Sequence, residues 1–141
     1  MKYYAVIDTN VLVSAMLKWE SVPGSIINLA FEGIIVPLVN SRILNEYRIV
    51  LSRSKFGLPK EIVDNIVKTM ELRGLNVDES PLDIELPDPD DKVFFEVVME
   101  ERKTEDAYLV TGNIKHFPVK PFVVTPRQML DIILNTSEVF D

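Results

Sequence analysis

Four separate segments of this chain carry side-chain oxygens of the kind that bind a hard metal ion. They are Asp8, Glu46, the group Asp88, Asp90 and Asp91, and Asn113. Carboxylates that are brought together repel one another and stay ionised only when a cation joins them. Oxygen ligands completed by water are what Mg²⁺ or Mn²⁺ prefers. Such an ion can activate water and offset the charge that develops on a phosphodiester.

Two of these residues also have ordinary structural explanations. Asp8 ends the apolar run "YYAVI" and could cap a helix that starts near Asn10, although capping leaves a metal ligand role open. Glu46 could instead be a solvated helical residue or an ion-pair partner of Arg42 or Arg48. Its place at the margin of an apolar stripe nevertheless favours partial burial.

The acidic group at 88–91 and the single histidine also have structural interpretations. Asp90 is interpreted as a helix N-cap and Asp88 as a loop residue, which leaves Asp91 as the one expected to face the other acids. The lone His116 is interpreted as structural rather than as a general base.

Alternating strand and helix patterns must position these side chains. Apolar β-rich runs predict strands at 2–8, 34–39, about 75–78, 106–113 and 121–126. Helical spacing predicts helices at 10–20, 24–33, 40–53, 60–74, 91–103 and 126–135. Strands separated by helices imply an α/β fold, with a parallel sheet between helices on both faces. Ligands bind such sheets at the carboxyl ends of the strands, where Asp8 and Thr111–Asn113 would share one rim.

Charge is unevenly distributed in this chain of 141 residues with a net charge of −7. Residues 42–73 carry seven Lys or Arg against four acids, and residues 74–106 carry twelve acids against three bases. The overall charge argues against broad, non-specific binding of nucleic acid. The uneven charge distribution has two interpretations. It is either an ordinary solvated surface, or a basic arm beside an acidic pocket that cations must fill.

Composition sets several further expectations. The chain has no cysteine, which excludes disulfides, thiolate zinc sites and a cysteine nucleophile. No apolar run approaches the roughly 20 residues of a membrane span, and "MKYYAVID" is too short for a signal peptide. We therefore expect one domain over 1–141, located in the cytoplasm without membrane contact.

The chain resembles the PIN-domain nucleases, in particular the group described as toxins of toxin–antitoxin pairs. The resemblance rests on "VIDTNVLVSA" at 6–15, "SRILNEY" at 41–47, "DPDDKVFFEVV" at 88–98 and "YLVTGNIKHF" at 108–117. It implies a Rossmann-like α/β/α sandwich with about five parallel strands, and an Mg²⁺- or Mn²⁺-dependent endoribonuclease. The partners it implies are RNA, a cognate antitoxin protein and a second copy of the chain.

The resemblance also assigns residues. The family's three catalytic and metal-binding acids fall on Asp8, Glu46 and Asp91. The usual fourth acid falls on Asn113, a neutral and weaker ligand, which puts a second metal and full activity in doubt. Asn10 would orient Asp8, Thr111 would hold a carboxylate or a water, and Asp88 would compensate for the missing charge. The RNA-binding residues expected on the basic arm are Arg42, Arg48, Arg53 and Lys55.

Three other functions compete with a ribonuclease. A dehalogenase-like phosphatase needs a second aspartate two residues after the first, where this chain has Asn10. A receiver domain needs paired acids just after the first strand, and these are missing although Lys115 could serve as its late lysine. A catalytically degenerate PIN scaffold that binds protein or RNA is the strongest alternative, and Asn113 favours it.

Overall fold

The structure is a computed structural model that describes residues 1–140, with side chains described for residues 1–135. Its strands are β1 (Tyr3–Ile7), β2 (Ile35–Val39), β3 (Leu75–Asn76), β4 (Ala107–Val110) and β5 (Val123–Val124). They form one parallel sheet in the order β3-β2-β1-β4-β5. The predicted five-stranded parallel sheet is therefore confirmed. Strand order reverses beside β1, which places the expected ligand-binding crevice at its carboxyl end.

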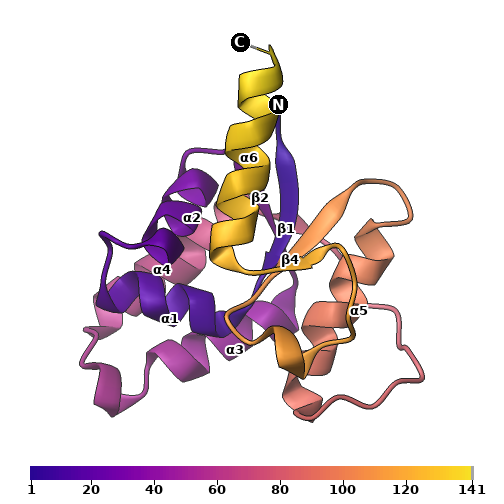
Figure 1. Cartoon of the computed structure of the whole chain (residues 1–141). Helices are drawn as coiled ribbons and strands as arrows, with labels where there is room; N and C mark the ends of the chain where they lie inside the picture. Colours follow the sequence, from indigo (N-terminus) through magenta and orange to yellow (C-terminus); the bar gives the residue numbers. More distant parts are fainter. Residues whose placement is uncertain (141) are drawn as a thin grey trace.

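The helices are α1 (Thr9–Leu17), α2 (Val22–Phe31), α3 (Ser41–Leu51), α4 (Lys60–Arg73), α5 (Lys92–Glu101) and α6 (Pro126–Phe140). Three short 3₁₀ turns, η1 (Ser54–Phe56), η2 (Pro89–Asp91) and η3 (Ile114–His116), lie in the connections. Figure 1 shows α5 across the sheet from α1, α2 and α4, while α6 packs beside α2. Right-handed connections explain this division, because the chain moves one way across the sheet from β1 to β3 and back again to β4.

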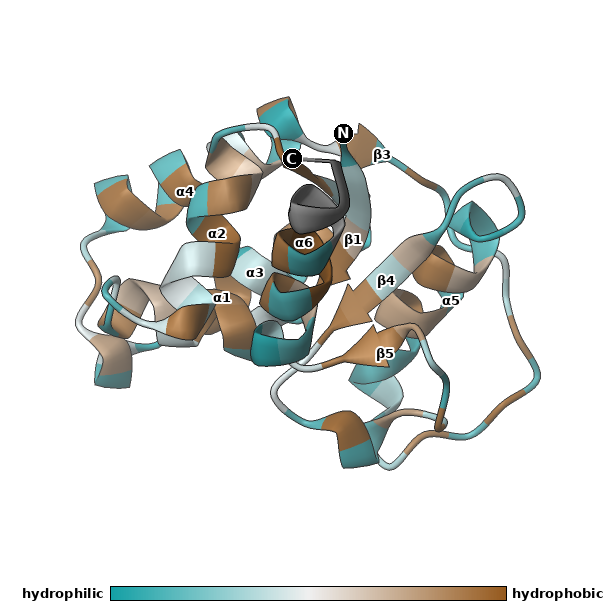
Figure 2. Cartoon of the chain, turned by 45° about the horizontal axis from the view of Figure 1, so that its top comes forward, coloured by the Kyte–Doolittle hydropathy of each residue, from teal (hydrophilic) through white to brown (hydrophobic). Residues whose placement is uncertain are grey.

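The core explains why the central strand is apolar throughout its second half. Ala5, Val6 and Ile7 have no exposed surface, because helices cover both faces of β1. The strands and the inward helix faces are hydrophobic, and polar residues lie on the outer helix faces (Figure 2). Pro37 is accepted in β2 because β3 pairs only with Leu38 and Val39, so position 37 has a partner strand on one side only.

The first predicted helix is shorter than its apolar spacing suggested. We expected 10–20, but α1 ends at Leu17 and Trp19 lies outside it, stacked on Phe31 of α2. The chain turns here because Ser21 caps α2, accepting a hydrogen bond from the amide of Gly24 at 3.1 Å. A Cβ at Gly24 would lie 1.8 Å from the carbonyl oxygen of Trp19, so only glycine permits this close return.

The strand ends create the rim that the sequence predicted. Asp8 follows β1, Asn40 follows β2, Thr111 follows β4 and Thr125 follows β5. Backbone hydrogen bonds continue the sheet into this rim, from the amide of Asp8 to Val110 and from the amide of Thr111 to Val124, both at 2.9 Å. Within residues 1–140 no helix is long and apolar enough to cross a membrane.

Candidate active site

Asp8 is the most buried acid of the rim, with 5% of its surface exposed. The hydroxyl of Thr111 donates a 2.7 Å hydrogen bond to its Oδ2, and the same hydroxyl oxygen accepts one from the amide of Asn113 at 2.9 Å. Burial raises the pKa of the Asp8 carboxyl, and the hydrogen bond from Thr111 opposes that rise. Although Asp8 occupies the N-cap position of α1, its side chain makes no capping hydrogen bond.

Asn10 contacts a different partner from the one we expected. Its Oδ1 accepts a 3.2 Å hydrogen bond from the amide of Gly112, which ties the start of α1 to the turn after β4. A Cβ at Gly112 would lie 3.5 Å from this oxygen. The hydrogen bond that orients Asp8 thus comes from Thr111, while Asn10 fastens the turn that carries Asn113.

Glu46 is positioned by its neighbour in α3. The hydroxyl of Tyr47, which is fully buried, donates a 2.5 Å hydrogen bond to the carbonyl oxygen of Ile7. This contact holds α3 against the end of β1, directly before Asp8. Partial burial raises the pKa of Glu46, the negative charge of Asp90 raises it further, and Arg53 opposes both.

Asp91 enters the site from η2, the turn that leads into α5. The Asp88 side chain accepts a 3.0 Å hydrogen bond from the amide of Asp90, so Asp88 is the capping residue and our assignment of Asp90 as the cap was wrong. The error arose because the 3₁₀ turn starts the helical stretch two residues earlier than the pattern suggested. Burial, followed by the charges of Asp8 and Asp88, raises the pKa of Asp91 to about 6.

His116 lies against this acid. Its Nδ1 is 3.4 Å from Oδ2 of Asp91, and the histidine lines the same pocket. The contact joins η3 to η2, two turns that follow different strands. No local pattern of residues indicated this contact, because the two residues are far apart in the chain and the short 3₁₀ turns carry no periodicity.

One open pocket of about 430 Å³ joins these side chains. The polar residues that line it are Asp8, Thr9, Asn10, Ser14, Glu46, Arg53, Asp88, Asp90, Asp91, Asn113 and His116. Val13, Val50 and Phe56 provide its apolar part. The structure therefore brings together every acid that the sequence analysis singled out, with Asn10 and Asn113, while Thr111 supports Asp8 from behind the pocket wall.

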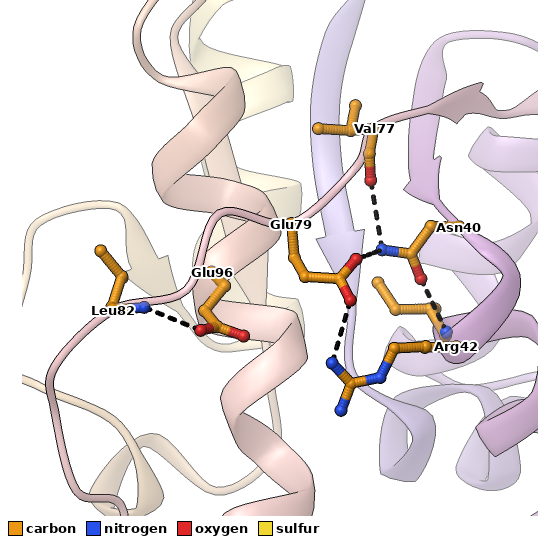
Figure 3. A network of polar contacts seen from close by, with 7 residues as sticks. Asn40, Arg42, Val77, Glu79, Leu82 and Glu96 are labelled. Atoms are coloured by element: carbon orange, nitrogen blue, oxygen red, sulfur yellow. Dashed lines mark hydrogen bonds and ion pairs between the residues drawn. The ribbon is translucent and has the colours of Figure 1, made fainter.

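The four cations expected to bind RNA are divided between different surroundings. Arg53 lines the pocket, and Lys55 Nζ lies 5.1 Å from the ring centre of Phe56. Arg42 instead pairs with Glu79 at 2.9 Å (Figure 3), and Arg48 pairs with Asp64. Of these four cations, Arg53 lines the pocket, and Lys55 lies beside Phe56, which is a lining residue.

The side chains that line the pocket decide whether it can hold a divalent ion. In the conformation seen, no three His, Asp or Glu side chains among the described residues converge on one point as ligands. Two features nevertheless fit a hydrated ion in this pocket. After burial, the negative charge of Asp8 helps to raise the pKa of both Glu46 and Asp91, a repulsion that a cation would relieve. Thr9 Oγ1 is buried without a hydrogen-bond partner among the described residues, so it could bond a water of the hydration shell.

Comparison with known proteins identifies one family. A family model described as "PIN domain" matches residues 4–115, a range that contains Asp8, Glu46, Asp91 and Asn113. Searches of curated proteins and of solved structures gave no significant match.

Proposed function

The chain belongs to the PIN-domain family, whose members are generally nucleases that use divalent metal ions, and we propose that it is an Mg²⁺- or Mn²⁺-dependent endoribonuclease. The observation that carries the proposal is the shared pocket of Asp8, Glu46 and Asp91, in which each carboxyl has a raised pKa. Carboxylates held in this way are what a metal-dependent phosphodiesterase needs. We extend the proposal to a single domain of this type over residues 1–141, acting on cytoplasmic RNA.

Each pocket residue has a proposed part in the reaction. Asp8, Glu46 and Asp91 would hold the metal, with Asn113 as a weaker neutral ligand. When bound, the ion would activate water and offset the charge developing on the phosphate. Thr111 fixes the orientation of Asp8 through its 2.7 Å hydrogen bond, and Arg53 offers a cation to a phosphate beside Glu46.

The decisive experiment is incubation of a mixed RNA pool with the protein, with and without Mn²⁺. We expect cleavage that requires the metal and falls at least about 100-fold in Asp8→Asn, because that variant loses a ligand charge. Asp131→Asn, which removes an exposed acid of α6 outside the pocket, is the matched control and should cleave like the wild type. Equal cleavage by Asp8→Asn would place the activity elsewhere.

The toxin role is a finer part of the same proposal. It rests on the resemblance of the four motifs to toxins of toxin–antitoxin pairs, and it implies a cognate antitoxin and a second copy of the chain as partners. A toxin of this type should arrest growth when expressed alone, and Asp8→Asn should relieve the arrest. Growth arrest that persists in Asp8→Asn would separate toxicity from this site.

A binding scaffold without catalytic activity is the second candidate. Asn113 favours it, because an amide lines the pocket where the family's usual fourth acid would add a negative charge. A protein of this kind would retain RNA or a protein partner without cleaving RNA. The same RNA pool distinguishes the two, since binding without metal-dependent cleavage supports the scaffold.

A further inference from the structure

The pocket has two chemically different walls. The end of β1, the η2 region and Glu46 of α3 supply its acids, whereas Val50 near the end of α3, Arg53 and Phe56 of η1 form the rest of the wall on that side. Phe56 is half-buried and packs against the core, and its ring lines the pocket. No metal ligand or proton carrier is needed on this second wall, so its composition points to the binding of another part of the substrate.

The position of Phe56 is fixed by the backbone rather than by a flexible loop. The amide of Arg53 bonds the carbonyl of Val50, and the amide of Phe56 bonds the carbonyl of Arg53, at 3.1 and 3.0 Å. Gly57 then ends the turn with a φ of 63°, a conformation that favours glycine. Backbone hydrogen bonds thus link the turn to the end of α3, the helix that carries Glu46.

The surroundings of the ring match those of a nucleobase platform. Lys55 Nζ lies 5.1 Å from the ring centre, and Arg53 lies at the start of the same turn. Within residues 1–135, the stacked or tilted ring pairs join other aromatic residues and leave Phe56 without an aromatic partner. An aromatic face flanked by cations is the arrangement that binds single-stranded nucleic acid, with bases on the ring and phosphates on the cations.

We propose that Phe56 is a stacking platform for one base next to the cleaved phosphate. The inference rests on the proposed function and adds a base-binding residue to the same site. A base within a duplex has both faces covered by its neighbours, so it cannot stack on a side chain without being unstacked first. Arg53 and Lys55 would bind the phosphates on either side of that base.

The test measures binding of a labelled ten-nucleotide single-stranded RNA and of the same sequence as a duplex. It is done with Mn²⁺ in an Asp8→Asn background, so that the RNA stays intact. Phe56→Leu should weaken single-strand binding roughly 5- to 150-fold, the usual worth of one stacked base, and leave duplex binding unchanged. Phe56→Tyr keeps a ring and should bind like the parent protein.

Phe122→Leu is the matched control. Phe122 is also half-buried with a cation, Arg102, over its ring at 4.2 Å, but it lies outside the pocket. Its loss should leave RNA binding unchanged. If Phe56→Leu lowers the unfolding temperature, Phe56→Met supplies a second non-aromatic side chain that adapts to the same space.

A double-mutant cycle with abasic RNA locates the stacked base. One abasic position should weaken binding to the parent protein and have no further effect in Phe56→Leu. Three results would overturn the stacking proposal: losses of affinity that add at every abasic position, an equal loss of affinity for duplex RNA, or no loss of affinity in Phe56→Leu. If the wild type still cleaves RNA in that case, the proposed function stands. A wild type that neither binds nor cleaves RNA would overturn both.

Discussion

In two clusters of polar side chains at neighbouring strand ends, the pKa values of the carboxyl groups shift in opposite directions. After β2, Asn40 donates hydrogen bonds to the carbonyl of Val77 and to Glu79, and Glu79 also accepts one from Arg42 (Figure 3). The Arg42 hydrogen bond lowers the pKa of Glu79. After β1, burial raises the pKa of Asp8, and burial together with neighbouring acids raises the pKa of Glu46 and Asp91. We call these the Asn40 network and the Asp8 cluster.

The difference separates stability from function. Both polar atoms of the Asn40 amide and both oxygens of the Glu79 carboxylate have a partner, so the network fastens the segment after β3 to the start of α3. The Asp8 cluster gathers negative charge, and Arg53 is the only Lys or Arg among the residues lining the pocket. Such an arrangement costs stability and is retained where a ligand offsets it.

Asn40→Ala should give the largest loss of stability. Asn40 is buried, its Oδ1 caps α3 by accepting from Ile43 at 2.9 Å, and its amide group serves two further acceptors. Losing the cap and leaving buried acceptors unpaired should lower the free energy of unfolding by about 2–3 kcal/mol in urea denaturation. The folded variant should still cleave RNA at nearly the wild-type rate.

Two further variants provide controls for the stability loss expected in Asn40→Ala. Asn28→Ala removes an exposed amide that bonds Glu32 within α2, and it should change stability by less than about 0.5 kcal/mol. Asp8→Asn should leave the metal-free protein equally or more stable, because it relieves repulsion. A loss of stability in Asp8→Asn as large as that in Asn40→Ala would show that the Asp8 cluster is structural.

The Asn113→Asp variant tests metal binding by the Asp8 cluster. We expect the wild type to bind one ion weakly and to prefer Mn²⁺ over Mg²⁺, since two ions about 3.5–4 Å apart repel and need more carboxylates to offset them. An added carboxylate should tighten Mn²⁺ binding about tenfold, because charged oxygen ligands bind a divalent ion more strongly than amides.

Calorimetric titration of Mn²⁺ measures both the affinity and the number of ions. Asn10→Asp is the matched variant, because it adds the same charge to another amide lining the pocket and keeps the oxygen that accepts from Gly112. Tightening in Asn113→Asp that exceeds the effect of Asn10→Asp would identify a ligand position. Two ions per wild-type chain, or no tightening, would contradict it.

The smallest effect is the pH dependence contributed by Asp91. Its pKa rises from 3.8 to about 6 on folding, so between these values the folded state holds a proton that the unfolded state has lost. In metal-free buffer its contribution to stability is therefore intact below about pH 4 and falls as the pH rises through 6. Solvent screening limits the effect, and we expect about 1 kcal/mol.

Urea denaturation of wild type and Asp91→Asn at pH 4 and pH 7 isolates this contribution. The variant should gain stability relative to the wild type as the pH rises, because it cannot ionise. Glu79→Gln should show the opposite trend, since the lowered pKa of Glu79 contributes stability at high pH that is lost on acidification. A difference between Asp91→Asn and wild type that is the same at both pH values would contradict the proposed repulsion.

The sequence by itself determined the fold class, the succession of strands and helices along the chain, and the rim on which Asp8 and Asn113 lie. Apolar runs and helical spacing are local, so they predicted each strand and most helices. They failed at Trp19 and at Asp90, where Gly24 and a 3₁₀ turn rather than periodicity decided the boundary.

Only the tertiary structure decided which side chains meet. The Asn10 side chain bonds Gly112 while the Thr111 side chain bonds Asp8, and His116 contacts Asp91. Arg42 and Arg48 pair with acids, whereas Arg53 lines the pocket with Phe56. These contacts join segments up to a hundred residues apart. Their geometry depends on how turns and helices pack around the sheet, and no local pattern of residues encodes that packing.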